Sequence, residues 1–356
     1  MTRSLGELPA LDRAVDRPLR RAVCVTVNAS VDKVAAVDRL VPGEIHRPQM
    51  LSVVAGGKTI NVARAATRLG LGAVVVPIVA GHAGSWLVEA LATEGIPARP
   101  VSISGETRTC LSILDRATGR LTEIYEPGPP LDATSWAELE AAIGAELATD
   151  GQDAVVVMSG SLLPGAPRDA YARIVALARR AEARSVVDAD GVVLAEALAA
   201  RPWLVRVNAA EAARATGLEP GGETETLAAA RALRDGGAAM AIVTRGVDGA
   251  VLVDEGGDAW RLGPPPEHGP YPVGSGDAFL AGFLAGIASG ASAAEAARWA
   301  VAAGAANALR PGQGAVDRAD VERMRPQVAL SPFPPDSTRV TTAAPEPGRL
   351  VGGALS

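Results

Sequence analysis

The sequence predicts a doubly wound α/β fold, in which a mainly parallel sheet carries helices on both faces and a small β lid is added. Short Val-rich runs alternate with Ala-rich stretches of helical character along most of the chain. The Val-rich runs are continuously apolar, which is typical of strands buried on both faces of a parallel sheet. Two segments, 34–54 and 99–125, carry β-type patterning without intervening helices, and they predict the lid.

The predicted elements follow one another as βαβ units, because a helical stretch follows most of the apolar runs. The predicted strands are Ala22–Val27, Ala73–Val79, Ala154–Met158, Ser185–Asp188, Leu204–Val207 and Ala239–Thr244. The predicted helices are Ile60–Leu69, Gly84–Ala92, Arg168–Arg180, Thr224–Arg234 and Ala291–Leu309. Ligands of such open sheets bind outside the carboxyl ends of the strands, so functional motifs are expected in the strand-to-helix loops.

Length and composition describe an enzyme-sized globular protein of 356 residues with a net charge of −6. That charge argues against nucleic acid and anionic membranes as partners, since both need a basic surface. Cys24 and Cys110 give neither a disulfide framework nor a zinc spacing. We expect a loose extension at 1–20, a folded domain at 21–330 and a disordered tail at 331–356. With no charged-then-apolar leader and no apolar run of membrane-spanning length, the expected location is the cytoplasm.

The stretch from Val273 to Gly286 is the strongest candidate for chemistry. A glycine-rich turn runs into an apolar helical segment, so the backbone N–H groups of Gly274, Ser275 and Gly276 would form an anion site at a helix start. Asp277 lies in that positively polarised turn. It is either an ordinary first-turn residue or a general base aimed at an anionic group that the amides hold.

Two earlier motifs could bind a ligand. In Ala55–Ala63 a Gly-Gly turn is followed by Lys58 and Asn61, so Gly57 would let a ligand approach the backbone; a plain helix N-terminus explains the pattern equally well. The glycine spacing excludes a Walker A loop. Asn28 and Asp32 follow the first strand and could hold hydroxyls, although a turn with capping side chains explains them too.

Lysine usage adds a second hint at these motifs. Of 34 basic residues only Lys33 and Lys58 are lysines, and both lie in the two motifs. This is either coincidence or a requirement for a compact ammonium where a planar guanidinium would not fit.

A second group of residues could serve a nucleotide. Asn208 and Glu211, three residues apart, share one helix face; they form either a helix cap or a pair that organises magnesium-bound water around phosphates. Turn chemistry accounts for Gly246 and Gly249, while Thr244 at a strand end could contact a phosphate or ribose.

Arginines in the lid segments and a serine after a strand complete the candidates. Arg47 and Arg108 are either solvated, as most such residues are, or placed to clamp a substrate phosphate in a bidentate manner. Ser161 follows the strand Ala154–Met158 within a Ser-Gly-Ser sequence.

Taken together and in this order, these motifs resemble the ribokinase-like, or PfkB, family of carbohydrate kinases. The resemblance covers about residues 21–325 and is carried by Gly56–Ala63, Asn208–Glu211 and Val273–Phe279. The segments Thr107–Cys110, Thr122–Pro129 and Ser159–Gly165 are similar to the branch of that family that phosphorylates phosphosugars.

The resemblance implies ATP and Mg²⁺ as cosubstrate and cofactor, and a phosphosugar as acceptor, with fructose 1-phosphate ahead of fructose 6-phosphate and tagatose 6-phosphate. It implies Asp277 as the base and the amides of Gly274, Ser275 and Gly276 as the anion hole. It assigns the sugar to Asn28, Asp32, Gly57, Lys58 and Asn61, and the sugar phosphate to Arg108, Ser161 and Arg47. It assigns nucleotide and magnesium to Asn208, Glu211, Thr244, Gly246, Gly249 and Asn307, with Glu211 reaching Mg²⁺ through water. By analogy, a homodimer would form through the lid.

Three positions depart from the family pattern. Thr59 replaces a usual glycine, Ala29-Ser30 replaces Pro-Ala, and Asp188–Gly191 differs from Asp-Thr-Ser-Gly. Two of these departures are expected to touch the sugar site. The alternatives are a kinase for an unphosphorylated sugar or nucleoside, and a non-catalytic sugar-phosphate or nucleotide sensor on the same fold. A dinucleotide oxidoreductase is set aside, because no Gly-x-Gly-x-x-Gly follows the first strand.

Overall fold

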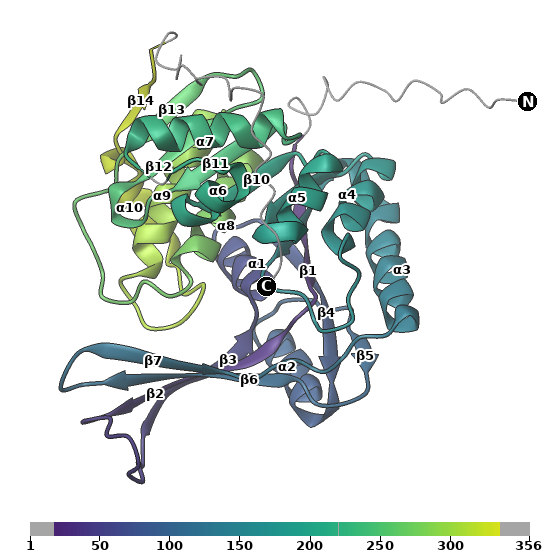
Figure 1. Ribbon diagram of the computed structural model, residues 1–356, viewed down its shortest axis with the longest axis vertical. Coiled ribbons are helices and arrows are strands. Elements are labelled where there is room, and N and C mark those ends of the chain that lie inside the picture. Colours follow the sequence, from purple (N-terminus) through teal and green to yellow (C-terminus); the bar gives the residue numbers. More distant parts are fainter. Residues whose placement is uncertain (1–17, 220, 335–356) are drawn as a thin grey trace, which may run out of the picture.

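A ten-stranded, mainly parallel sheet forms the centre of the computed structural model, which describes residues 18–219 and 221–334 (Figure 1). Its order is β14-β13-β12-β11-β10-β9-β8-β1-β4-β5. The seven strands from β11 to β5 pair in parallel, and β12, β13 and β14 add antiparallel pairs at one edge. The strands are β1 (Arg21–Thr26), β4 (Gly72–Ala80), β5 (Val101–Ile103), β8 (Ala154–Ser159), β9 (Arg184–Asp188), β10 (Leu204–Asn208), β11 (Met240–Thr244), β12 (Ala250–Val253), β13 (Ala259–Leu262) and β14 (Leu330–Pro332).

The order of the strands reverses at β1. After β1 the chain builds β4 and β5 on one side, and it then returns to add β8, β9, β10 and β11 on the other. Such a reversal opens a crevice at the carboxyl ends of the strands, where doubly wound folds bind their ligands.

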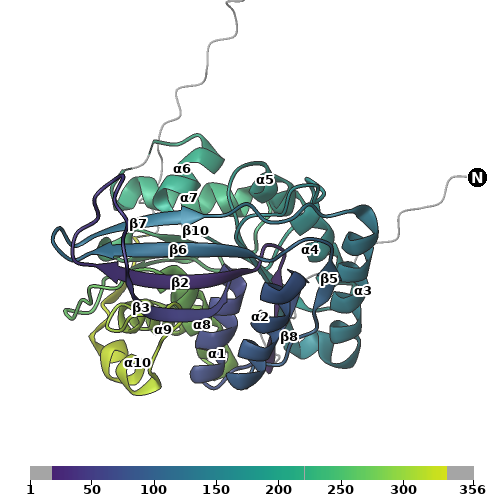
Figure 2. The same cartoon turned by 90° about the horizontal axis from the view of Figure 1, so that it is seen from below.

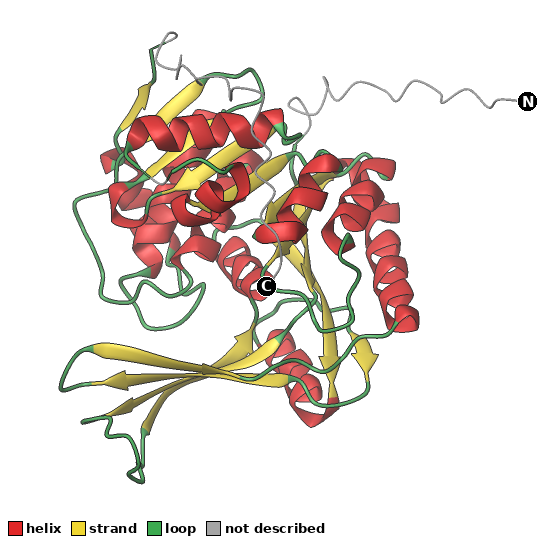
Figure 3. Cartoon of the chain, viewed as in Figure 1, coloured by secondary structure: helices red, strands yellow, loops and turns green. Residues whose placement is uncertain are grey.

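Helices cover both faces of this sheet (Figure 3). Alternate residues of β1 point to opposite faces, so Val23 and Val25 enter one hydrophobic core and Cys24 enters the other. The first core is shared with α3 (Ala133–Asp150), α4 (Ala170–Arg180), α5 (Gly191–Ala199), α6 (Ala209–Thr216) and α7 (Glu223–Asp235). The second is shared with α1 (Lys58–Arg68), α2 (Gly81–Thr93), α8 (Ser275–Ala288), α9 (Ala293–Asn307) and α10 (Arg318–Met324).

Helix α8, which starts at the edge of the crevice, packs closely against α9. A Cβ atom added at Gly282 would lie 2.6 Å from the carbonyl oxygen of Trp299, so this glycine lets the two backbones approach. The remaining residues of α8 from Asp277 to Gly286 are buried. The contact fixes the direction in which the N-terminus of α8 points.

A separate four-stranded sheet forms the lid, which projects from the body below the crevice (Figures 1 and 2). Its order is β3-β2-β6-β7, from β2 (Ser30–Val37), β3 (Gln49–Gly56), β6 (Arg108–Asp115) and β7 (Arg120–Tyr125). The lid starts earlier than the predicted 34–54, so Asp32 and Lys33 lie on a lid strand. The predicted second segment, 99–125, is partly wrong, because β5 within it pairs with β4 of the main sheet.

The predicted fold class is confirmed, and each predicted strand and helix overlaps an observed one. The elements that were not predicted include helices α3, α5 and α10 and strands β13 and β14. Ser331 and Pro332, assigned to the disordered tail, belong instead to β14, whose register pairs Leu262 with Leu330. Residues 335–356 and 1–17 of the expected tail and extension lie outside the described residues. None of the described helices is long and apolar enough to span a membrane.

Candidate active site

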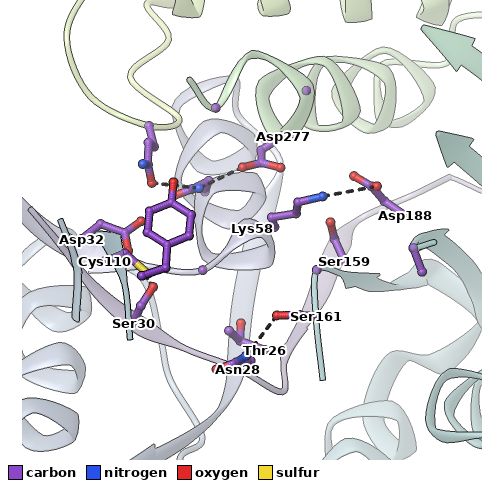
Figure 4. A pocket seen from close by; sticks show the side chains of 18 of the residues that line it. Thr26, Asn28, Ser30, Asp32, Lys58, Cys110, Ser159, Ser161, Asp188 and Asp277 are labelled. Atoms are coloured by element: carbon purple, nitrogen blue, oxygen red, sulfur yellow. Dashed lines mark hydrogen bonds and ion pairs between the residues drawn. The ribbon is translucent and has the colours of Figure 1, made fainter. Parts of the chain in front are cut away.

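A cavity of about 720 Å³ lies where the carboxyl ends of β1, β8 and β9 meet the start of α8 and the base of the lid (Figure 4). The cavity brings together predicted site residues that lie up to 249 positions apart in the sequence, Asn28 and Asp277. The predicted site residues that line it are Asn28, Asp32, Gly57, Lys58, Asn61, Arg108, Ser161, Glu211, Gly274, Gly276 and Asp277.

Asp277 is the third residue of α8, and it is 7% exposed at the edge of this cavity. Gly274 precedes the helix with φ 82°, a left-handed conformation that glycine adopts without strain. The side-chain amide of Asn61 donates to Asp277 Oδ2 at 2.8 Å. Burial raises the pKa of Asp277 to about 7, in spite of the hydrogen bond from Asn61 and the nearby Lys58 and Arg206, which lower it. A carboxylate with that pKa is suited to accept a proton near neutral pH.

The anion hole is only partly as predicted. Gly274 and Gly276 line the cavity, but the N–H of Ser275 donates to the carbonyl of Pro272 at 3.1 Å, and Ser275 is not among the lining residues. The unpaired first-turn amides of α8 that remain available are therefore those that follow Ser275.

Asp188 and Arg206 are site residues to which the sequence assigned no role. Asp188 at the end of β9 is 1% exposed; its Oδ2 accepts from Arg206 Nη1 at 3.1 Å, and its Oδ1 lies 3.8 Å from Lys58 Nζ. The charge of Asp188 is the main cause that raises the pKa of Lys58. A Cβ atom at Gly276 would lie 2.6 Å from Arg206 Nη2, so this guanidinium lies directly under the start of α8. The available signal was a charged residue within each of two predicted strands, Ser185–Asp188 and Leu204–Val207.

The lid end of the cavity holds the predicted sugar residues. Asp32 is 7% exposed and accepts from the hydroxyl of Ser30 at 2.6 Å, and burial raises its pKa. Its carboxylate lies against Gly56, where an added Cβ atom would be 2.1 Å from Asp32 Cγ. Arg108 on β6 donates to the carbonyl of Asn28 at 3.3 Å.

Asn28 and Ser161 meet although they are far apart in sequence, since Asn28 Nδ2 donates to Ser161 Oγ at 3.0 Å (Figure 4). Other buried polar atoms around the cavity have no hydrogen-bond partner among the described residues: Asn28 Oδ1, Arg108 Nε, Ser159 Oγ and Arg206 Nε. Buried polar groups are normally paired. Their concentration here indicates that the cavity accommodates a strongly polar ligand.

Comparison with known proteins decides the family. Residues 21–319 match the pfkB family carbohydrate kinase. The chain belongs to that family. It is 34% identical over 284 residues to 1-phosphofructokinase of Rhodobacter capsulatus, covering 79% of this chain and 88% of the relative. It is 32% identical over 311 residues to ATP-dependent 6-phosphofructokinase isozyme 2 of Mycobacterium tuberculosis, covering 87% and 90%.

Solved structures agree with this family assignment. Phosphofructokinase-2 from Escherichia coli, in its tetrameric inhibited form, superposes with a TM-score of 0.79 at 28% identity, covering 86% of this chain and 98% of that one. A possible 1-phosphofructokinase from Thermotoga maritima has the same fold, with a TM-score of 0.80 at 23% identity and coverage of 88% and 100%. The chain is therefore a sugar kinase with a ribokinase-like fold.

Two of the residues predicted to serve the nucleotide, Asn208 and Thr244, end β10 and β11. Asn208 and Glu211 form a capping box: each side chain accepts from the other residue's backbone N–H at 2.9 Å. Glu211 nevertheless lines the cavity, whereas Asn208 does not. Thr244 Oγ1 accepts from Arg206 Nη2 at 3.1 Å.

The remaining predicted nucleotide residues do not line the cavity. Gly246 begins a short 3₁₀ turn and Gly249 follows it; a Cβ atom at Gly249 would lie 1.9 Å from the carbonyl oxygen of Leu262. Asn307 is fully buried behind the glycine turn, where it donates to the carbonyl of Val273 at 2.9 Å and accepts from the N–H of Ala315 at 3.2 Å. These residues shape the turns around the site, and Asn307 has no exposed surface with which to contact a nucleotide.

Arg47 lies away from this cavity, on the connection between β2 and β3. It lines a smaller cavity of about 310 Å³ near the tip of the lid, together with Arg39, His46 and Arg116. Within one chain Arg47 does not line the main cavity, so it is not placed to contact a sugar phosphate there as predicted.

Thr59, which departs from the family glycine, does not face the cavity. It is fully buried, and its hydroxyl lies 2.5 Å from Thr26 Oγ1 and donates to the carbonyl of Val25 at 3.1 Å. The expectation that this departure touches the sugar is therefore wrong.

Proposed function

We propose that this kinase transfers the γ-phosphoryl group of ATP to a hydroxyl of a hexose phosphate, most specifically fructose 1-phosphate. The observation that carries the proposal is the position of Asp277: a buried carboxylate with a pKa near 7, at the N-terminus of α8, within a polar cavity. Relatives named 1-phosphofructokinase and 6-phosphofructokinase isozyme 2 at 34% and 32% identity support a phosphosugar acceptor.

In the proposed reaction the acceptor hydroxyl attacks the γ-phosphorus in line. Asp277 takes the hydroxyl proton as the new O–P bond forms, the bond from the γ-phosphorus to the β,γ-bridging oxygen breaks, and ADP leaves. The first-turn amides of α8, Lys58 and Arg206 offset the charge on the phosphoryl oxygens. Positioning contributes most, because a loose transition state demands little prior deprotonation of the hydroxyl.

The lid end of the cavity supplies the acceptor contacts. Asp32, Asn28 and Asn61 would bind sugar hydroxyls, while Arg108 and Ser161 would bind the sugar phosphate. The polar atoms of Asn28 and Arg108 that have no partner within the described chain support this division.

Glu211 would hold Mg²⁺ through water, and the ion would neutralise charge on the ATP phosphates. No group of three or more His, Cys, Asp or Glu residues in 18–219 and 221–334 could hold a metal by itself. Glu211 still fits, because Mg²⁺ usually takes one or two carboxylates together with phosphate oxygens and waters.

The lid has features that favour assembly with a second copy of the chain. Apolar side chains are exposed along β3 and β7, including Val53 at 43%, Leu121 at 40% and Ile124 at 55%. Exposed apolar patches of this kind mark association surfaces, and strand edges pair readily with another sheet. We propose a homodimer formed by two lids.

One assay tests the acceptor. ADP release with ATP and Mg²⁺ is measured against fructose 1-phosphate, fructose 6-phosphate, tagatose 6-phosphate, fructose and ribose. The proposal expects the highest kcat/KM with fructose 1-phosphate and little turnover of the two unphosphorylated sugars. A higher kcat/KM with fructose or ribose than with any phosphosugar would reject a phosphosugar kinase, and a preference for fructose 6-phosphate would reassign the acceptor.

A further inference from the structure

Arg64 is a buried arginine of α1 whose five N–H donors are all used, yet it does not line the cavity. Its side chain is 5% exposed. Nε and Nη2 donate to the two carboxylate oxygens of Glu94, Nη2 also donates to the carbonyl of Ala55 at 2.7 Å, and Nη1 donates to Asn61 Oδ1 and to the carbonyl of Gln313, both at 3.1 Å. A guanidinium has five donors in a rigid fork, so this set leaves it no freedom to rotate.

The bond to Asn61 determines what that amide can do. Because Oδ1 of Asn61 is held by Arg64, its Nδ2 group faces the opposite way, toward Asp277 Oδ2 at 2.8 Å and Gln313 Oε1 at 3.3 Å. A rotated amide would present oxygen to the carboxylate and lose both contacts. Arg64 therefore fixes the orientation of the one side chain that donates to Asp277 in the structure described for this chain.

Arg64 also joins the pieces that form the site. Its partners are the end of lid strand β3 at Ala55, the residue after α2 at Glu94, and the loop that carries Gln313. That loop contacts the turn before α8, since a Cβ atom at Gly274 would lie 2.9 Å from the Cα atom of Gln313. One guanidinium thus connects the lid, helix α1 and, through the loop of Gln313, the turn that precedes α8 and Asp277.

We propose that Arg64 is a positioning residue of the phosphoryl transfer: by holding Asn61 Oδ1, it keeps Asn61 Nδ2 on Asp277 and sets the direction in which the carboxylate accepts the proton. The inference rests on the proposed function of Asp277 as the base. Lysine cannot substitute, because an ammonium group lacks the planar fork that contacts Glu94, Ala55, Asn61 and Gln313 together.

The pH dependence of activity reports this role. The charged groups that face Asp277 are Lys58 from α1, Asp188 at the end of β9 and Arg206 from β10, and none of them is changed by substituting Arg64. The hydrogen bond from Asn61 lowers the pKa of Asp277. When Asn61 is free to rotate, the carboxylate loses that donor, so its pKa rises and the acidic limb of the pH profile moves to higher pH.

The experiment compares Arg64→Met, Arg64→Lys and the control Arg234→Met by the pH profile of kcat/KM. Arg234 likewise donates to backbone carbonyls, those of Ala239 and Glu255 at 2.9 Å, but far from the cavity. Both Arg64 variants are expected to lower kcat by about tenfold, the value of one charged hydrogen bond, and to move the acidic limb up by about one pH unit. Arg234→Met is expected to leave the limb in place.

Three results would overturn the inference. The first is an acidic limb that does not move in Arg64→Met, and the second is an acidic limb that Arg64→Lys leaves at its wild-type position. The third is a shift of the limb by Arg64→Met that is as large in the Asn61→Ala background, where no amide remains to be held, as in the wild-type protein. If Arg64→Met does not fold, Glu94→Gln provides the test, because it keeps the shape of the anchor and removes one of its two acceptors. A smaller movement in the same direction is expected, and none would reject the role.

A second readout separates this inference from the proposed function. The carboxyl carbon of Asp277 is titrated by NMR in ¹³C-labelled protein, with its signal identified by its absence from Asp277→Asn. A higher pKa of Asp277 in Arg64→Met supports the positioning role, whether or not the protein turns over a sugar. If that pKa rises and no sugar is turned over, only the proposed function is rejected. Normal turnover of phosphosugar with an unchanged pKa in Arg64→Met rejects the positioning role alone.

Discussion

Replacing Asp277 by asparagine removes the proposed base while keeping its shape. The amide oxygen of the new side chain can accept from Asn61 Nδ2 as Asp277 Oδ2 does, at 2.8 Å, so the site keeps its hydrogen bond. General base catalysis contributes about 10²–10⁴-fold to a rate. We therefore expect kcat to fall by about that factor, while the dissociation constant of ATP stays nearly the same.

The same substitution should stabilise the protein at high pH. Burial raises the pKa of Asp277 from 3.8 to about 7. At 1.36 kcal/mol per pH unit, ionisation of Asp277 lowers the free energy of unfolding by at most about 4 kcal/mol. Because the folded pKa is the higher one, ionisation of Asp277 opposes folding. This cost is absent below pH 3.8, grows between pH 3.8 and 7, and is complete above pH 7. Asparagine never ionises, so its advantage follows the same course.

Urea denaturation of both proteins at pH 5 and pH 8 measures this effect, alongside ADP release. The variant should gain more stability at pH 8 than at pH 5. Asp132→Asn is the control: Asp132 caps α3, and the N–H of Ser135 holds the pKa of its carboxyl below its ordinary value. The stability that this carboxylate contributes is therefore already complete at pH 5, and its loss should be equal at pH 5 and pH 8. An Asp277→Asn protein that turns over normally, or that is less stable at pH 8, would refute the reasoning.

Three other changes test the remaining parts of the site. Arg108→Ala should raise KM for a phosphosugar about tenfold and barely change KM for an unphosphorylated one; equal effects in steady-state assays would reject the phosphate contact. Gly56→Ala places a Cβ atom 2.1 Å from Asp32 Cγ, so sugar affinity measured by calorimetry should fall while ATP affinity does not. Ile124→Asp on the lid should shift the sedimentation coefficient toward the monomer; an unchanged value would place the assembly surface elsewhere.

The parallel part of the fold could be predicted because it has a simple sequence signal. Strands such as β1 and β8 contain continuous apolar runs, Ala22–Val25 and Ala154–Met158, since both faces of the sheet are covered. Strand β14 has no such signal: it is three residues long and contains Pro332, which an edge strand tolerates. Its pairing with β13 depends on tertiary contact, which local sequence does not encode.

The site was predictable where a motif supplies both backbone and side chain. Gly274, Gly276 and Asp277 are neighbours in sequence, so their relation is local. Arg206 and Asp188 were missed because local sequence does not show that a charged residue of one strand faces a charged residue of another. Their pairing at 3.1 Å exists only because β9 and β10 are adjacent in the sheet.

The departures from the family pattern lead to a conclusion about acceptor choice. Thr59 lies behind β1, hydrogen-bonded to Thr26 and Val25, so the extra hydroxyl is used within the core and does not line the cavity. Ser30, by contrast, donates directly to Asp32, and both lie on lid strand β2 beside Arg108 of β6. The departure at Ser30 therefore changes the hydrogen bonding of Asp32, and this change lies on the lid. We propose that acceptor specificity is determined on the lid strands, while the transfer chemistry is determined at the start of α8.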